Sequence, residues 1–431
     1  MMKRVWMADL FATAIASAAR YRRYVNSSLL YLMSSVLTAA IALLINPAMA
    51  SNLSPSDYAL LGYLTSFNYI LVPLFSFSLV SYFLRNYFKL SEERREVVSD
   101  TILIALTAYG FMALLGSLSI FYIYARWSGL NFSYYPYVLL AFAPVYLNNM
   151  LVFFQVTCRV RRDAAKFCLV TVLNALLSAG LALLFVVHYE SGAVGRLSAT
   201  LIASLFTAVY CFRHLFKRFR FDHAVIKEAF LFGWPISVST MLWYFFNGVD
   251  SMMLERLHDS YTFGYYNVGL QIAGYLSLFY TAVAQTFEPD IYQAVSVNNV
   301  RRLFYLIAGI LFLNSLPNLF YICFTREILD LLTAGHYLGA EAFSKIFAIK
   351  NIAMGVYYSS ITVIVAYGFP KSELSIRIVG SVICLLMFNL LIKNFAFVGA
   401  AWGQVASFVM MSTLNGAYIC YMLRRRGVAA A

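Results

Sequence analysis

The sequence is poor in charged residues. Only 12% of its 431 residues are Asp, Glu, Lys or Arg, whereas 62% are hydrophobic. A soluble chain of this length would have to hide nearly all of its apolar side chains, and it has too little polar surface to cover them. The composition therefore excludes a soluble enzyme, a disordered protein and a disulfide-stapled secreted module. It predicts an integral membrane protein.

Motifs of common enzymes and metal sites are also missing. The six cysteines form no CxxC pair, and no GxxxxGK[ST], GxSxG or HExxH motif occurs. These absences exclude a P-loop ATP site and give no support to a hydrolase or a zinc peptidase. No outward loop is large enough for the chemistry of a glycan polymerase or ligase, which is a minor alternative. We therefore expect no cofactor, apart from a coupling H⁺ or Na⁺ if the protein is a transporter.

Twelve stretches of the chain are long and apolar enough to span a bilayer. The loops between them are short and leave no room for a second soluble domain. The sequence thus predicts an all-α integral membrane protein with about twelve transmembrane helices. The expected spans are 27–49, 58–84, 98–123, 134–157, 165–188, 193–213, 228–253, 261–287, 301–324, 341–367, 373–393 and 395–422.

Positive charge is distributed unevenly between the two sides of these spans. If the N-terminus is cytoplasmic, most of the 32 Lys and Arg residues fall in inward segments. This asymmetry predicts that both termini are cytoplasmic. It also accounts for most of the net charge of +13 without a nucleic-acid partner. The outward segments hold Arg126, Arg196, Arg256, Arg326 and Lys393.

Similar residues recur about 203 positions apart, as in the pair Tyr58 and Tyr261 and the pair Asn148 and Asn351. Together with six expected spans in each half, this offset predicts two homologous six-helix lobes around a central cavity. The expected segments are a cytoplasmic or interfacial N-terminal segment 1–25, an N-terminal lobe 26–213, a basic cytoplasmic linker 214–227, a C-terminal lobe 228–422 and a basic cytoplasmic tail 423–431.

Several short motifs occur in a characteristic order. They are Phe232-Gly233-Trp234-Pro235-Ile236, Asn247-Gly248-Val249-Asp250-Ser251-Met252-Met253-Leu254, Gly264-Tyr265-Tyr266, Tyr367-Gly368-Phe369-Pro370-Lys371 and Val398-Gly399-Ala400-Ala401. This order resembles the polysaccharide transporter family, the Wzx-type oligosaccharide flippases of the multidrug/oligosaccharidyl-lipid/polysaccharide exporter superfamily. The resemblance covers about residues 25 to 422.

The resemblance implies a function in polysaccharide biosynthesis. A flippase of this family moves undecaprenyl-diphosphate-linked repeat units of O-antigen, capsule or exopolysaccharide from the inner to the outer leaflet of the bacterial cytoplasmic (inner) membrane. It works by alternating access and without ATP. The implied partners are the lipid-linked oligosaccharide, membrane lipids and the polysaccharide polymerase machinery.

Asp250 is a candidate for ion coupling, because a carboxylate within a span is costly and usually has a function. It lies near the outer end of the seventh span, with Asn247 one turn earlier on the same expected face. The carboxylate could bind a proton or Na⁺ or accept a sugar hydroxyl. Alternatively, it caps a helix at the interface or pairs with Arg256.

Lys350 and Asn351 lie deep in the tenth span, and Lys345 lies nearer its outer end. A cationic lining would attract a diphosphate or acidic sugars. For Lys345 the ordinary alternative is snorkelling to the membrane interface. Since positions 345 and 350 are separated by roughly 140° around a helix, the two lysines need not face the same way.

Arg377 and Arg85 lie near the expected cytoplasmic ends of their spans. Either could contact the lipid diphosphate, for which Arg offers bidentate hydrogen bonds. Arg377 could instead form an i,i+4 pair with Glu373 at the interface, and Arg85 could be a plain topology charge.

Neutral amides and aromatic residues complete the candidates. Asn68, Gln271 and Asn148 could bind sugar hydroxyls, although hydrogen bonds between helices are the commoner use of such amides. The cluster Trp243 to Phe246 could stack against sugars, but we expect it to face lipid or to pack.

A drug/cation antiporter of the same superfamily is the closest alternative. Such an exporter needs buried carboxylates in its lumen, whereas a carrier of lipid diphosphates needs buried Lys or Arg. Here Lys350 and Lys345 compete with Asp250, and the balance favours the flippase.

Overall fold

A computed structural model of the protein describes residues 30, 33–130 and 132–425. The predicted N-terminal segment 1–25 lies outside these residues. The described residues are helical and form no strand. Ten of their helices are long and apolar enough to cross a membrane. One of these, α17 (Pro370–Arg425), is two helices joined across a break at Ala396.

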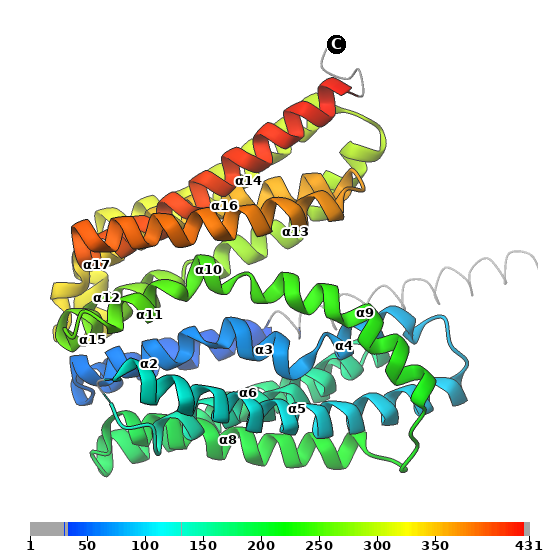
Figure 1. The fold of residues 1–431 in the computed structure, drawn as a ribbon, viewed down its shortest axis with the longest axis horizontal. Coiled ribbons are helices and arrows are strands. Elements are labelled where there is room, and N and C mark those ends of the chain that lie inside the picture. The colour runs from blue at the N-terminus through cyan, green and yellow to red at the C-terminus, as the bar shows by residue number, and fades with distance from the viewer. Residues whose placement is uncertain (1–29, 31–32, 131, 426–431) are drawn as a thin grey trace, which may run out of the picture.

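The described residues form two lobes, as the sequence predicts, and each lobe consists of six helical segments (Figure 1). The crossings of the first lobe are a first helix (Met33–Asn52), α2 (Pro55–Ser66) with α3 (Asn68–Ser76) and α4 (Leu79–Tyr87), α5 (Glu92–Ser128), α6 (Tyr137–Arg161), α7 (Ala164–Ala182) with the π-helical turn η1 (Leu183–His188), and α8 (Gly192–Leu215).

The second lobe repeats this plan. Its crossings are α9 (His223–Met241) with α10 (Tyr244–Asn247) and α11 (Val249–Glu255), α12 (Ser260–Gly274) with α13 (Ser277–Ser296), α14 (Val300–Cys323), α16 (Glu341–Ala366) and the two halves of α17. The short helix α15 (Thr325–Thr333) and the turn η2 (Leu338–Ala340) connect α14 to α16.

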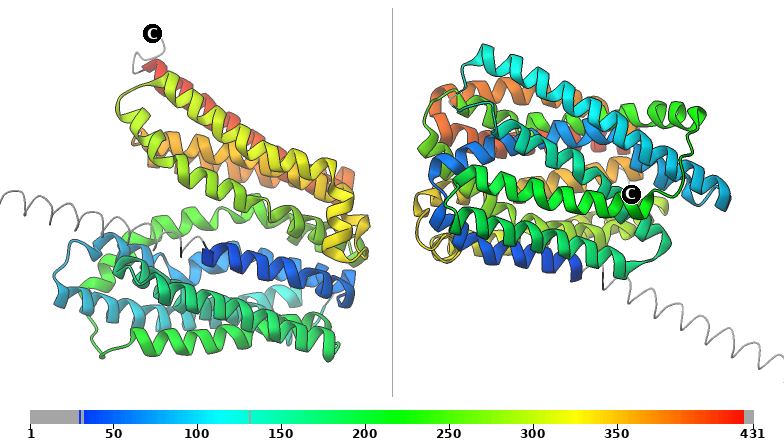
Figure 2. Two further views of the ribbon diagram at one scale, coloured as in Figure 1. Left: turned by 180° about the vertical axis from the view of Figure 1, so that it is seen from behind. Right: turned by 90° about the horizontal axis from the view of Figure 1, so that it is seen from below.

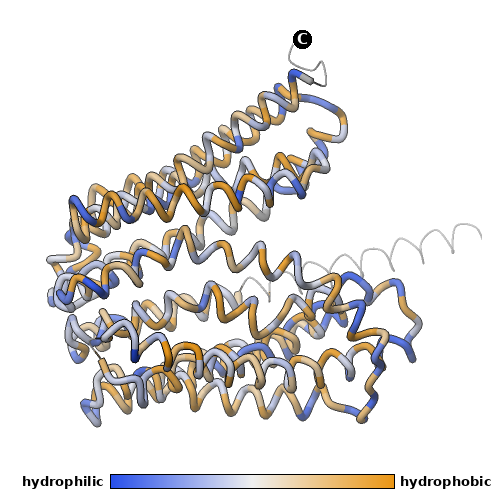
Figure 3. Tube along the Cα trace, in the orientation of Figure 1, coloured by the Kyte–Doolittle hydropathy of each residue, from blue (hydrophilic) through white to orange (hydrophobic). Residues whose placement is uncertain are grey.

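Polar residues cap the helices at the two ends of the bundle. Ser54 and Asp57 form a capping box at the start of α2, and a second carboxylate oxygen of Asp57 accepts the Ala193 N–H of α8 at 2.9 Å. Asp222 caps α9, and the N–H of Ala224 helps to lower the pKa of its carboxyl. Hydrophilic residues therefore gather at the two ends, with largely hydrophobic helices between them (Figure 3).

The two ends of the bundle differ in how the lobes meet. We call the end with loops 88–91, 216–222 and 367–369 the basic end, and the opposite end the closed end. The lobes lie close together at the closed end and diverge toward the basic end (Figures 1 and 2). Both lobes contribute to one shared hydrophobic core, for example through Tyr63 and Tyr266. Toward the basic end each lobe has a separate core.

Glycines allow the two lobes to touch at the closed end. A Cβ on Gly264 of α12 would lie 2.1 Å from the backbone oxygen of Pro55 at the start of α2. A Cβ on Gly62 of α2 would lie 2.0 Å from the Asn267 side chain of α12. Since such distances are shorter than any van der Waals contact, the two helices can approach this closely only without these side-chain atoms.

Polar contacts reinforce the same interface. Gln271 of α12 donates to the Asn46 side chain of the first helix at 3.0 Å. Asn46 in turn donates to the Leu332 carbonyl at 2.7 Å. The Tyr337 hydroxyl donates to the Leu53 carbonyl at 2.5 Å. These bonds join the first lobe to α12 and to the segment around α15.

Helix α9 belongs to the second lobe in sequence but packs on the first. Ser237 hydrogen-bonds Ser78 at 2.9 Å, and Tyr82 of α4 donates to Glu228 at 2.8 Å. Val225 and Ala229 lie in the separate core of the first lobe. The predicted lobe boundary at residue 228 therefore does not coincide with the packing, because the chain changes lobe along α9 to α11.

Replacing Gly264 by Ala should weaken the closed end, because the added methyl group must displace the Pro55 backbone. We expect spin labels at Asn52 and Tyr261, in a background without native cysteines, to report a longer or broader distance distribution. Gly274→Ala on the same helix is the control, because its Cβ meets nothing within 4 Å. Equal distributions for both variants would contradict the proposed role of Gly264.

Candidate functional site

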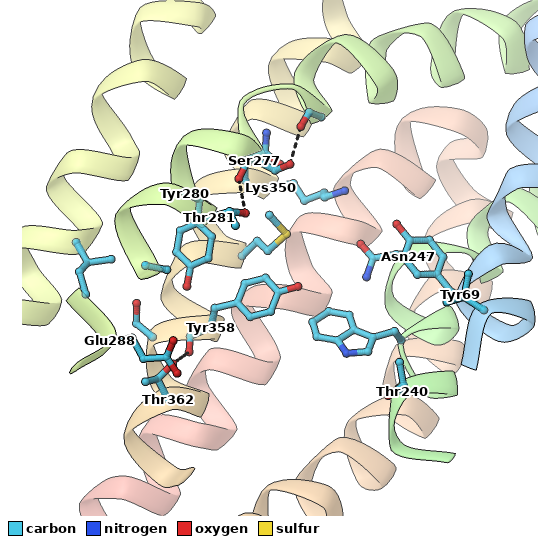
Figure 4. Close-up of a pocket in the computed structure, with 18 of the residues that line it drawn as sticks. Tyr69, Thr240, Asn247, Ser277, Tyr280, Thr281, Glu288, Lys350, Tyr358 and Thr362 are labelled. Carbon is cyan, nitrogen blue, oxygen red and sulfur yellow. Dashed lines mark hydrogen bonds between the residues drawn. The ribbon is translucent and has the colours of Figure 1, made fainter. Parts of the chain in front are cut away.

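A cavity of about 810 Å³ lies between the lobes. Residues of α3 line it from the first lobe, and residues of α12, α13 and α16 line it from the second. Thr240, Trp243 and Asn247, which lie around the junction of α9 and α10, also line the cavity. Its charged lining residues are Lys350 and Glu288, and its remaining polar groups are hydroxyls and amides (Figure 4). A cavity of this size can hold a ligand of several sugar rings or a comparable headgroup.

Lys350 of α16 is the cation of this cavity. It is 8% exposed, and its ammonium group points toward Asn247 and Tyr69 across the space (Figure 4). Its Nζ atom lies 5.7 Å from the centre of the Phe347 ring. The ion pairs found in the described part of the chain do not include Lys350. No ion pair among the described residues therefore occupies its ammonium group.

Three aromatic rings form a ladder along the cavity wall. Trp243 stacks on Tyr358 at 5.4 Å between ring centres, and Tyr358 stacks on Tyr280 at 5.4 Å. All three line the cavity. The expectation that the cluster packs is confirmed for Tyr244 and Phe246, which are buried, whereas Trp243 also lines the cavity. Such ring faces can bind the apolar faces of sugars.

Arg377 of α17 supports this ladder from behind. Its guanidinium lies 5.2 Å from the Trp243 ring centre and donates to the Ser239 carbonyl at 3.1 Å. Its ion pair with Glu373, at 2.5 Å, confirms the predicted i,i+4 pair. Arg377 is only 8% exposed and does not line the cavity, so the pair is a buried brace between α17 and α9 rather than an interfacial one.

A second cavity of about 670 Å³ lies nearer the closed end. It shares Asn68, Tyr69, Asn247 and Leu270 with the first cavity, so the two adjoin. Arg196 of α8 is the only charged residue in its described lining. Arg196 was predicted to be an outward charge; it lies near the closed end of α8, and its side chain also lines this cavity.

Asp250 lies outside both cavities. It is fully buried inside the second lobe, where Tyr266 of α12 donates to its Oδ2 atom and Gln404 of α17 donates to the same oxygen at 2.6 Å. Gly248 interrupts the helix between α10 and α11, so Asn247 faces the cavities while Asp250 faces the lobe interior. The predictions that they share a face, and that Asp250 could be an interfacial cap or a partner of Arg256, are wrong.

A chain of contacts connects the Asp250 cluster with the cavity. The ring of Tyr266 packs edge-on against Phe347 at 5.0 Å, and Lys350 lies over the same Phe347 ring. Asp250 and Lys350 also attract each other electrostatically. A change of charge at Asp250 would therefore change the electrostatic potential at the Lys350 ammonium group.

The predicted amides divide between cavity and packing. Asn68 and Asn247 line both cavities. Asn351 lines the larger one, but its side chain donates to the Ala273 carbonyl at 2.8 Å and so joins α16 to α12. Gln271 lines the smaller cavity and bonds Asn46 across the lobes. Asn148 is exposed and lines neither cavity.

Two predicted cations lie away from the cavities. Lys345 pairs with Glu341 at 2.6 Å on the partly exposed end of α16. Arg85 is exposed, and its guanidinium lies 4.7 Å from the Phe232 ring centre, where it joins α4 to α9. Neither lines a described cavity, so their predicted contact with the substrate is not supported by their position.

Comparison with known proteins identifies the family. The family described as "Polysaccharide biosynthesis protein" matches residues 25–295. The chain belongs to this family. No curated protein matches it in sequence. Family membership agrees with the resemblance drawn from the sequence motifs.

Solved structures of the MOP superfamily share the fold. A multidrug resistance MATE family transporter in the inward-facing conformation matches with a TM-score of 0.72 and 15% identity, over 91% of this chain and 96% of that one. The lipid II flippase MurJ in an inward closed conformation matches with a TM-score of 0.71 and 12% identity, over 92% of this chain and 87% of that one. This polysaccharide biosynthesis protein is therefore a multi-pass membrane protein with a transporter fold.

A third solved structure shares the fold at a lower score. A MATE family transporter in the outward-facing conformation matches with a TM-score of only 0.58, again at 15% identity, over 94% of this chain and 97% of that one. The two MATE structures and the MurJ structure thus share the fold of this chain.

Tyr266→Phe should destabilise the protein, because it removes one donor from the buried Asp250 carboxylate while it keeps the ring. We expect a loss of about 1–3 kcal/mol in the free energy of unfolding, measured by denaturant titration in detergent. Tyr261→Phe on the exposed side of α12 is the control. If both variants were as stable as the wild type, Asp250 would not depend on this donor.

Proposed function

We propose that this protein is a flippase for lipid-linked oligosaccharides of the undecaprenyl-diphosphate type, and a transporter rather than an enzyme. The observation that carries the proposal is the 810 Å³ cavity between the lobes, in which the unpaired Lys350 lies beside the ladder of Trp243, Tyr358 and Tyr280. The cation suits a diphosphate, and the ladder suits sugar rings.

The charge balance of the two cavities supports an anionic cargo. Their described linings hold two cations, Lys350 and Arg196, and one carboxylate, Glu288. Glu288 lies in α13 beyond Tyr280, on the side of the cavity away from Lys350 and Asn247 (Figure 4). A diphosphate entering the cavity therefore meets a net positive lining at its centre.

Alternating access would proceed by rocking of the lobes. The lobes share a core at the closed end and have separate cores toward the basic end. Rocking would open the shared contact at the closed end while the lobes approach each other at the basic end. We place the basic end in the cytoplasm, so that cargo enters from the inner leaflet of the cytoplasmic membrane. The sugars and diphosphate would pass between the lobes while the prenyl tail stays in lipid.

Asp250 is our candidate for coupling to an H⁺ or Na⁺ gradient. Its Oδ1 atom and the Oε1 atom of Gln404 are buried and have no hydrogen-bond partner. Two such oxygens suit a cation, and the carboxylate alone suits a proton. Either would cancel the negative charge that attracts Lys350 and would leave its ammonium free for the cargo.

A drug/cation antiporter remains the second candidate. Glu288 lines the larger cavity and could bind a cationic compound, and the matched MATE structures are described as multidrug resistance transporters. In that case, loss of Glu288 would abolish export while loss of Lys350 would not.

Lys350→Gln should reduce flipping by about tenfold or more, because a cation–phosphate contact is worth roughly 1.5–3 kcal/mol. The measurement is the leaflet location of prenyl-diphosphate oligosaccharide in cells that lack this protein and any substitute flippase. Lys345→Gln is the matched control, because Lys345 lies on the same helix but pairs with Glu341 outside the cavity.

The same cells separate the two candidate functions. Full flipping by Lys350→Gln, or normal export of the glycan without the protein, would contradict the flippase. Glu288→Gln would then be tested against cationic dyes, and its failure to export them would favour the antiporter.

Asp250→Asn should remove the dependence of transport on the ion gradient, because an amide can neither take up a proton nor hold a cation as a carboxylate does. We would measure uptake into vesicles with and without H⁺ and Na⁺ gradients. Asp259→Asn is the control, since Asp259 caps α12 outside the buried cluster. Gradient-dependent transport that survives in Asp250→Asn would exclude this coupling site.

A further inference from the structure

Arg196 is a cation without a counter-charge in the smaller cavity. It extends from α8 of the first lobe, about one turn from the closed end of that helix. No acidic residue is present among the described residues that line this cavity. The Nη1 atom of Arg196 is buried and has no hydrogen-bond partner. A guanidinium in this position has lost water without gaining a protein acceptor at Nη1.

The neighbouring amides do not satisfy it. Asn46 and Gln271 line the same cavity, but Gln271 donates to Asn46 Oδ1 and Asn46 donates to the Leu332 carbonyl. These bonds hold the lobes together, and neither amide accepts a hydrogen bond from the buried Nη1 atom of Arg196. Tyr58 lines the cavity beside them. The Nη1 atom of Arg196 is therefore open to an acceptor that enters the cavity.

We propose that Arg196 forms a second anion-binding station, which takes a phosphate or diphosphate group after Lys350. This inference rests on the proposed function and adds to it a site in the other lobe. The two cavities adjoin through Asn68, Tyr69, Asn247 and Leu270. An anion that moves from Lys350 to Arg196 would therefore pass these four shared side chains.

The positions of the two cations give the path a direction. Lys350 belongs to the second lobe and faces the larger cavity, which extends along α13 as far as Glu288 and Ile291. Arg196 belongs to the first lobe and lies behind the glycine contact of α2 with α12 at the closed end. When the lobes part at the closed end, the anion bound at Arg196 is the one that faces the exit. Arg suits this step, because its planar fork holds a phosphate by two hydrogen bonds.

The test is the affinity of the purified full chain for farnesyl diphosphate, measured by calorimetry in a neutral detergent. Arg196→Gln should weaken binding by about tenfold or more, and Arg196→Lys by less, because Lys keeps the charge and loses the fork. Lys350→Gln should weaken binding as well, and the double variant should bind more weakly than either. Arg126→Gln is the matched control, since Arg126 is an exposed arginine at the same end.

Each outcome decides the proposal. If Arg196→Gln binds as the wild type does while Lys350→Gln does not, the second station is wrong and the proposed function stands. If the wild type binds farnesyl diphosphate no better than farnesol, the cargo class fails together with the station. Arg196→Lys should have the melting temperature of the wild type. Weaker binding by this folded variant then reports the loss of the contact with the anion and not a loss of folding.

Phosphatidylglycerol separates the cargo from a bilayer lipid as the source of the anion. We expect it to compete weakly and equally in the wild type and in Arg196→Gln. If it displaces farnesyl diphosphate from the wild type but not from Arg196→Gln, Arg196 binds a phospholipid headgroup. The station for the cargo would then be overturned.

Discussion

An unpaired cation between two membrane-embedded lobes is costly in free energy, and this protein has two of them. Lys350 and Arg196 both line cavities where no described acidic group forms an ion pair with them. Such charges are expensive in a membrane unless water, a counter-charge or a ligand reaches them. Arg377 shows the contrast, because it is as buried as Lys350 but pairs with Glu373 and contacts Ser239 and Trp243. The unpaired cations are therefore where an anionic cargo gains most by binding.

The same two lobes that hold these cations also control access to them. One shared core and the glycine contact between α2 and α12 seal the closed end, while separate cores leave the lobes apart at the basic end. Helix α9 stays with the first lobe and Arg377 ties its far end to the second. The chain from α9 to α11 is thus the covalent joint across which the lobes can move, and Trp243 lies at that joint.

The fold could be predicted from the sequence because hydropathy and charge asymmetry act on whole spans. The break expected between 393 and 395 lies beside Ala396, where α17 is interrupted. The residues of the site were harder to predict. Helix breaks decide which side chains point into the cavity, and hydropathy does not reveal these breaks. The turn at Gly248 separates Asn247 from Asp250, and the packing of α8 brings Arg196 into a cavity although its position in the chain reads as a loop charge. The position of Lys350 within its span was enough to predict that it is buried, and it is the one buried lysine among the described residues.

Reconstitution tests the central claim most directly. Purified protein in vesicles would be given a fluorescent prenyl-diphosphate oligosaccharide, and a membrane-impermeant quencher would report how much reaches the other leaflet. The account predicts transfer well above that of protein-free vesicles, and its loss when the closed end is cross-linked between α2 and α12. Transfer equal to that of protein-free vesicles, or transfer that continues with the closed end locked, would contradict it.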